Sequence, residues 1–106
     1  GIRDLKAIVQ DLSPDDLRGL AAQVNKRTTP SATLLASLAG GKATLVCICS
    51  EEAVARGLKA GDVLGELAAL LGGKGGGKPD FAMGGAPDDG SAEQTIADFA
   101  FPVEAS

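Results

Sequence analysis

The spacing of hydrophobic residues at the start of the chain predicts a strand followed by an amphipathic helix. Residues 5–10 form a short apolar run of the kind found in strands. Ser13-Pro14-Asp15-Asp16 is typical of a helix start, because serine caps, proline suits the first helical position and acids favour the positive end of the helix dipole. One apolar stripe then comprises Leu17, Leu20, Ala21 and Val24. Residues 28–30, Thr-Thr-Pro, are expected to end this helix.

Two further apolar runs predict a hairpin in the middle of the chain. Residues 33–38 and 43–49 each have the length and composition of a strand. Between them lies Ala39-Gly40-Gly41-Lys42, whose paired glycines suit the positive φ angles of a tight turn. We therefore expect the two strands to pair antiparallel.

Helices dominate the pattern in the second half of the chain. A short helix is expected to begin at Ser50 and to end at Gly57, and a longer one is expected over residues 60–71. Residues 81–83 predict a short strand, and residues 92–99 predict a last helix. The order βαββααβα indicates an α/β (α+β) fold, with helices packed against a mixed sheet of about four strands.

The length and apolar content of the chain fit one globular domain. At 106 residues, of which 44% are hydrophobic, residues 1–106 are expected to form a single core, with residues 100–106 as a frayed tail. Because the chain begins at Gly1, it is interpreted as a fragment of a longer protein. No stretch has the length and hydropathy of a membrane span and the start lacks a signal-peptide pattern, so no membrane partner is expected.

Cys47 and Cys49 are the only cysteines of the chain. On a strand they would point to the same face, but they would stand too far apart for easy bridging. We interpret them as buried free thiols, with redox and metal roles as the lesser alternatives. Free thiols fit a reducing compartment, so the expected location is cytoplasmic.

The composition lacks residues that the common catalytic mechanisms require. The chain has no histidine, the commonest general base and metal ligand. Two cysteines alone make no metal site, so neither a metal nor a cofactor is expected. With only Phe81, Phe99 and Phe101 as aromatic residues, stacking of bases on aromatic side chains is nearly excluded.

The charge of the chain is unevenly distributed. The net charge is −4, yet residues 1–79 carry all ten Lys and Arg against eight Asp and Glu, a balance of +2. Residues 80–106 carry the other six acids and no base. A mildly basic body with an acidic end leaves room for a local cationic patch and for an anionic partner.

The clearest chemical signal is the run Gly72-Gly73-Lys74-Gly75-Gly76-Gly77-Lys78-Pro79. It begins like the phosphate-binding P-loop, G-x-x-x-x-G-K, but Pro79 stands where a Ser or Thr would hold magnesium. The run also leaves a predicted helix instead of opening one, which would place the negative end of a helix dipole nearby. Hydrolysis of a nucleoside triphosphate is therefore rejected.

Three interpretations of this run remain open from the residues alone. Bare main-chain amides of a loop can form an anion nest, to which Lys74 and Lys78 would add positive charge for backbone phosphates. The run is otherwise a structural turn or a flexible linker. The return to apolar sequence directly afterwards is not typical of a linker.

Two segments resemble a known family when they are taken together. Residues 57–62, Gly-Leu-Lys-Ala-Gly-Asp, and residues 72–85, from the glycine run to Phe-Ala-Met-Gly-Gly, resemble the C-terminal domain of alanyl-tRNA synthetases. That domain belongs to the DHHA1 group, which is also attached to DHH phosphoesterases with a Gly-Gly-His element in this loop. The chain has no histidine, so it is similar to the synthetase form; Met83, where synthetases often carry Gln, is a departure.

The resemblance implies a non-catalytic domain that binds the elbow of tRNA and supports aminoacylation and editing by a parent alanine–tRNA ligase. Its expected partners are tRNA, tRNA-Ala in particular, and the other domains of the synthetase, while the oligomeric state stays open. Two alternatives also stay open. One is the substrate-binding domain of a DHH phosphoesterase or exonuclease that binds single-stranded nucleic acid. The other is a protein-interaction domain without affinity for nucleic acid.

The residues expected to contact RNA are the glycine run and two cations that precede it. The run supplies main-chain amides and two ammonium groups, and the cations flank Gly57 at a predicted helix end. The candidate residues are Gly73, Lys74, Gly75, Gly76, Gly77, Lys78, Arg56 and Lys59. No catalytic residue and no metal ligand is expected.

Overall fold

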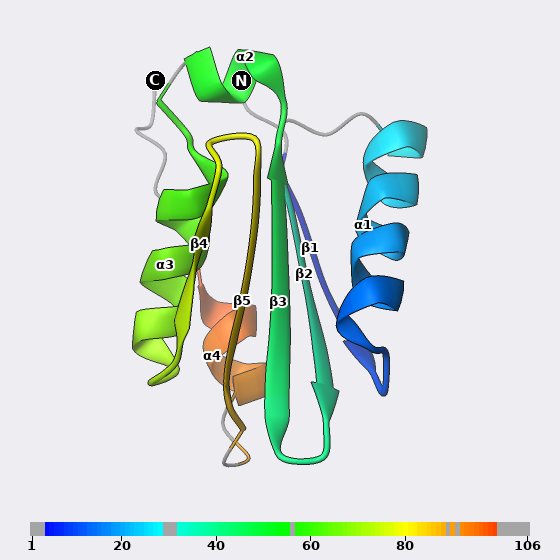
Figure 1. Cartoon of the computed structure of the whole chain (residues 1–106), viewed down its shortest axis with the longest axis vertical. Coiled ribbons are helices and arrows are strands. Elements are labelled where there is room, and N and C mark those ends of the chain that lie inside the picture. The colour runs from blue at the N-terminus through cyan, green and yellow to red at the C-terminus, as the bar shows by residue number, and fades with distance from the viewer. Residues whose placement is uncertain (1–3, 29–31, 56, 89, 91, 100–106) are drawn as a thin grey trace.

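One five-stranded sheet and four helices form the domain, within the residues that the computed structural model describes. These residues are 4–28, 32–55, 57–88, 90 and 92–99. The elements follow along the chain as β1 (Asp4–Gln10), α1 (Pro14–Thr28), β2 (Ala32–Ala39), β3 (Lys42–Cys49), α2 (Glu51–Ala55), α3 (Ala60–Leu70), β4 (Lys74–Gly77), β5 (Phe81–Pro87) and α4 (Ala92–Asp98) (Figure 1).

The sheet is mixed, and its strand order is β1-β2-β3-β5-β4. Strands β1 and β2 are parallel and are connected through α1, whereas the other neighbouring pairs are antiparallel. The predicted fold class is therefore confirmed. The sheet has five strands instead of about four, because part of the glycine run is a strand at its edge.

Helices cover both faces of the sheet (Figure 1). On one face, Leu17 and Ala21 of α1 are buried against Leu35 and Val46 of the two central strands. On the other face, the buried side chains of α3 and α4 form the larger core with the opposite sides of the same strands. The apolar stripe predicted for the first helix is the side of α1 that faces the sheet.

Local signals in the sequence set several of the observed helix ends. The hydroxyl of Ser13 accepts a hydrogen bond from the amide of Asp16 (3.2 Å), as expected of a capping serine. Helix α3 ends where Gly72 adopts a φ of 79°, and the amide of Gly73 then bonds to the carbonyl of Ala68 (2.8 Å). The hairpin predicted around Gly40 and Gly41 is also confirmed.

One sequence-based prediction differs from the structure in length, and another cannot be compared with it. The strand expected at residues 81–83 continues to Pro87, so it is longer than predicted. The tail expected at residues 100–106 lies outside the described residues. In the described part of the chain, none of the helices has the length and hydropathy needed to span a lipid bilayer.

Candidate nucleic-acid interface

Most of the glycine run is an edge strand, so the prediction of a loop that forms an anion nest is wrong for these residues. Lys74–Gly77 forms β4, which pairs antiparallel with β5. In this pairing Gly75 stands opposite Gly84, and Gly76 stands opposite Met83. The main chain is extended here because the neighbouring strand supplies its hydrogen bonds, although glycine itself has little preference for strands.

Close packing against α3 explains why this strand carries glycines. A Cβ atom on Gly61 of α3 would stand 2.9 Å from the carbonyl oxygen of Gly77. Within the sheet, a Cβ atom on Gly84 would stand 2.6 Å from the Cα of Gly75. Cβ atoms do not come this close to main-chain atoms, so the helix and the two strands approach one another only because side chains are missing.

The other side of β4 is open. Neighbouring residues of a strand point to opposite faces, so Lys74 and Gly76 lie on the side of the sheet that α1 covers farther along. A Cβ atom on Gly76 would meet no atom within 4 Å. Both residues are exposed, and Met83 beside them is half-buried. A ligand can therefore reach the main chain of β4 from this side.

The two lysines of the run do not share one bend. Lys74 begins β4 and Lys78 directly follows it, so they lie about 13 Å apart at the extended spacing of a strand. The two ammonium groups are therefore not carried by one loop. They are two separate points along an edge of the sheet.

The turn after β4 is held by main-chain hydrogen bonds. Within the turn, the amide of Lys78 donates to the carbonyl of Phe81 (2.8 Å). Two more bonds attach the turn to its surroundings: the amide of Ala60 donates to Pro79 (2.7 Å), and the amide of Cys49 donates to Asp80 (2.9 Å). The bond from Ala60 brings Lys59, an exposed residue, next to the turn that carries Lys78.

The positive end of a helix dipole also lies at this turn. Helix α3 begins at Ala60, and its N-cap residue Lys59 makes no capping bond through its side chain. Because β4 runs back along α3, the end of the glycine run returns to the N-terminus of that helix (Figure 1). The sequence predicted the opposite, the negative end, because it showed only which element the run leaves. An anion at this turn would meet a favourable dipole, moderated by Asp62 in the first turn of α3.

The cations at these positions are free to meet a ligand. Among the described residues, Lys59, Lys74 and Lys78 are exposed and form no ion pair. Arg18 of α1, in contrast, forms an ion pair with Asp15, at 3.4 Å. Arg56, the remaining predicted cation, lies outside the described residues.

Strand pairing adds a cation that the sequence did not single out as a site. Lys42 begins β3 and is exposed. Lys42 pairs with Pro87 of β5, and Lys74 pairs with Gly85 of the same strand. Their two partners are thus two residues apart on β5. Both lysines therefore lie on the open side of the sheet, near the same end. Only the register of three strands reveals this proximity, so no signal in the sequence could have found it.

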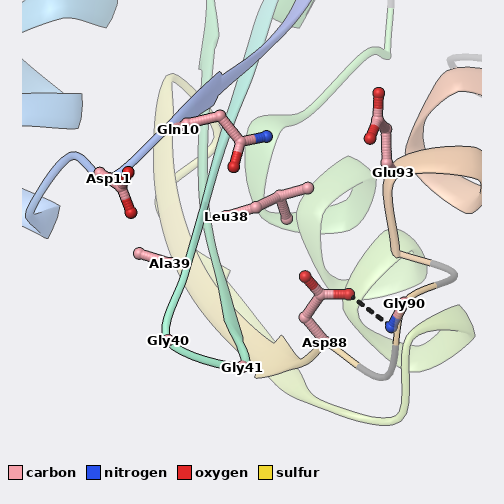
Figure 2. Close-up of a pocket in the computed structure, with 9 residues that line it drawn as sticks. All are labelled: Gln10, Asp11, Leu38, Ala39, Gly40, Gly41, Asp88, Gly90 and Glu93. Carbon is pink, nitrogen blue, oxygen red and sulfur yellow. Dashed lines mark hydrogen bonds between the residues drawn. The ribbon is translucent and has the colours of Figure 1, made fainter.

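The hollow shown in Figure 2 has the wrong charge for a nucleic acid. It measures about 320 Å³ and lies where the β2–β3 turn meets the segment before α4. Among the described residues, its lining includes the acidic residues Asp11, Asp88 and Glu93 and no lysine or arginine. Phosphates would be repelled here, so this hollow is not part of the candidate interface.

Comparisons with known proteins agree on one family. The model of the DHHA1 domain matches residues 4–100. The alanine–tRNA ligase of Bordetella avium is 41% identical over 97 residues, which cover 92% of this chain and 11% of that protein. The alanine–tRNA ligase of Opitutus terrae is 43% identical over 88 residues, 83% of this chain and 9% of that protein. The chain thus spans about a tenth of the length of these curated relatives.

A solved structure has the same fold. The C-Ala domain of alanyl-tRNA synthetase from Aquifex aeolicus superimposes with a TM-score of 0.77 at 26% sequence identity. The match covers 92% of this chain and 89% of that chain. The similarity therefore extends over nearly all of both domains.

Proposed function

The chain belongs to the DHHA1 domain family, and we propose that it is a non-catalytic tRNA-binding domain of an alanine–tRNA ligase. Its partners would be tRNA, tRNA-Ala in particular, and the other domains of the cytoplasmic ligase, whose aminoacylation and editing it would support. The names of its relatives support this proposal. In this role the domain performs no chemistry and needs no cofactor.

One observation carries the proposal: two exposed lysines, without an ion pair among the described residues, flank a main-chain hydrogen bond at the N-terminus of a helix. Lys59 and Lys78 are brought together by the bond between Ala60 and Pro79 (2.7 Å), beside the positive end of α3. Ammonium groups and helix N-termini both bind phosphate without reading a base. We propose that the turn at Lys78 holds one phosphate and that Lys74 contacts the sugar-phosphate backbone farther along.

A titration at two salt concentrations tests this function. The ligands are a tRNA-Ala transcript, an unrelated tRNA and single-stranded DNA. We expect both tRNAs to bind with similar affinity, because phosphate contacts do not read sequence, and to bind more weakly at the higher salt concentration. A preference for single-stranded DNA would favour a nuclease accessory domain. Absence of binding to any of the three would contradict the proposal.

Substitution of the lysines locates the site. The double variant Lys74→Ala/Lys78→Ala removes two exposed side chains, so its melting temperature should match that of the unchanged protein. The slope of log affinity against log salt should become shallower by about 0.7 to 0.9 for each phosphate that these lysines neutralise. Arg18→Ala, which removes an exposed cation from α1, is the matched control and should bind tRNA normally. Unchanged affinity in the double variant would exclude the side chains of Lys74 and Lys78 from the interface.

A further inference from the structure

Three neighbouring strands bring Thr44, Gly85 and Lys74 into one row across the sheet. Thr44 of β3 pairs with Gly85 of β5, and Gly85 pairs with Lys74 of β4. Residues directly opposite each other in paired strands share a face, so the side chain of Thr44 lies on the same open side as that of Lys74. Lys42 stands two residues before Thr44 on β3 and therefore shares this face as well. Two lysines and a hydroxyl group thus surround a residue that has no side chain.

Helix α1 leaves this part of the sheet uncovered. The helix packs against β2 and β3, and in Figure 1 it lies away from β4. Val46 of β3 is buried under it, whereas Met83, opposite Val46 on β5, is only half-buried. Two residues farther along β5, Gly85 is exposed. A ligand can therefore reach Gly85 from the open side.

The two lysines stand at a distance that one phosphate can bridge. Two strand spacings of about 4.8 Å and an offset of two residues place the Cα atoms of Lys42 and Lys74 about 12 Å apart. The flexible four-carbon stem of each lysine spans about half of that distance. Both ammonium groups can therefore contact one phosphate that lies between them, above Gly85.

Packing does not explain why residue 85 is a glycine. A Cβ atom on Gly85 would stand 3.5 Å from the carbonyl oxygen of Ala43, which is an ordinary contact, and the φ angle of Gly85 is not positive. Gly84 beside it differs, because its Cβ atom would stand 2.6 Å from the Cα of Gly75. The missing side chain at Gly85 instead lets a ligand approach the main chain of β5.

The charge on this side of the sheet favours an anion. Lys42 and Lys74 are exposed, and neither forms an ion pair among the described residues. The acidic hollow of Figure 2 lies near the same end of the sheet but on the other face. Its lining includes Leu38, which belongs to the core under α3 and α4. Phosphate is therefore attracted to one face of this end and repelled by the other.

We propose that Lys42, Thr44 and Lys74 hold a second phosphate of the RNA backbone above Gly85. The two ammonium groups neutralise its charge and the hydroxyl of Thr44 donates to one of its oxygens, contacts that position a backbone without reading a base. The turn at Lys78 lies about 13 Å farther along the strands, so one phosphate cannot occupy both sites. This inference rests on the proposed function, because it extends the same interface.

The surface between the two sites indicates the path of the RNA. Phe81 and Met83 of β5 lie on the open side between Lys78 and Gly85, and both are half-buried. Their uncharged, apolar side chains suit contact with a sugar and not with a phosphate. The RNA backbone therefore follows β5 from one phosphate site to the other.

Titration of the whole chain with tRNA at several salt concentrations tests the second site. Lys42→Ala and Lys78→Ala should each make the slope of log affinity against log salt shallower by about 0.7 to 0.9, and the double variant should show the sum, because two separate phosphates are lost. Lys42→Arg keeps the charge and should keep the slope. Normal binding by Lys42→Ala beside weak binding by Lys78→Ala would overturn the second site and leave the proposed function standing. Absence of tRNA binding by the unchanged protein would overturn both.

Two further variants test the site without any change of charge. The methyl group of Gly85→Ala occupies the position proposed for the phosphate, so affinity for tRNA should fall several-fold while the melting temperature is maintained. Thr44→Val should bind about two- to tenfold more weakly because one hydrogen bond is lost, and Thr44→Ser should bind normally. Unchanged affinity in both Gly85→Ala and Thr44→Val would overturn the site. If Gly85→Ala melts at a lower temperature, the exposed Lys42 and the pair of Thr44 variants decide the question.

Discussion

Alanine at Gly84 and alanine at Gly76 should have opposite effects, although the two glycines lie on neighbouring strands. At Gly84 the new methyl group would stand 2.6 Å from the Cα of Gly75 and 2.8 Å from the carbonyl oxygen of Lys74. Both are main-chain atoms of β4 and cannot rotate aside. At Gly76 the methyl group would meet nothing within 4 Å. The methyl group of Gly84→Ala forces β4 and β5 apart, whereas the methyl group of Gly76→Ala extends into solvent.

The expected stabilities follow from these contacts. Overpacking at Gly84→Ala should cost about 1 to 3 kcal/mol. In a domain of this size each kcal/mol shifts the melting temperature by about 4 to 8 °C, so Gly84→Ala should melt roughly 5 to 20 °C lower. The φ angle of Gly76 is not positive, so alanine fits its backbone and should add about 0.4 to 1 kcal/mol by restricting the unfolded chain. Gly76→Ala should therefore melt a few degrees higher.

Thermal unfolding followed by circular dichroism measures both variants, and a tRNA titration adds the second readout. If RNA approaches the bare main chain of β4, the methyl group of Gly76→Ala holds it away, and affinity should fall several-fold in a protein of undiminished stability. A melting temperature for Gly76→Ala as low as that of Gly84→Ala would show that the open side of β4 is wrongly assigned. Unchanged affinity in Gly76→Ala would show that RNA does not approach this strand closely.

Three further predictions concern the hydrogen bonding of individual side chains and are checked by chemical denaturation. Thr33→Val should stabilise the domain by about 1 kcal/mol, because the buried hydroxyl has no partner among the described residues; a loss of stability would contradict this reasoning. Lys6→Met should destabilise it by about 1 to 2 kcal/mol, because the ammonium group donates to two carbonyls at the end of α4 (2.7 and 2.6 Å); an unchanged midpoint would show that these bonds contribute nothing. Ser13→Ala should lower the free energy of unfolding by about 1 kcal/mol, because α1 loses its capping bond, whereas Ser13→Asp should keep most of that stability.

The elements that the sequence predicted correctly are those with a local physical cause. A capping serine, an apolar stripe and a pair of glycines in a turn each act within a few residues, so Ser13, the stripe of α1 and the turn at Gly40 could be identified without a structure. Strand β4 has no such cause. Glycine disfavours strands, and this strand exists because β5 pairs with it and α3 packs over it.

The candidate site was predictable in its residues but not in its arrangement. The lysines and glycines could be identified by their chemistry, and the described ones are exposed except Gly73, which is half-buried directly before β4. That Lys59 lies next to the turn of Lys78 depends on the return of β4 along α3 and on one bond between Ala60 and Pro79. These contacts join residues about 20 apart in the chain, and no spacing in the sequence encodes them.

The structure changes which observation supports a phosphate ligand. In the sequence, the density of glycines was the main argument, since bare amides suggested an anion nest. Gly61, Gly75 and Gly84 are now accounted for by the approach of α3, β4 and β5, and packing would require them with or without RNA. The glycines alone are therefore no evidence of binding. Besides Gly76, packing leaves unexplained two lysines that form no ion pair among the described residues, at a helix N-terminus without a side-chain cap. The proposed function therefore depends on Lys59 and Lys78 more than on the glycine run.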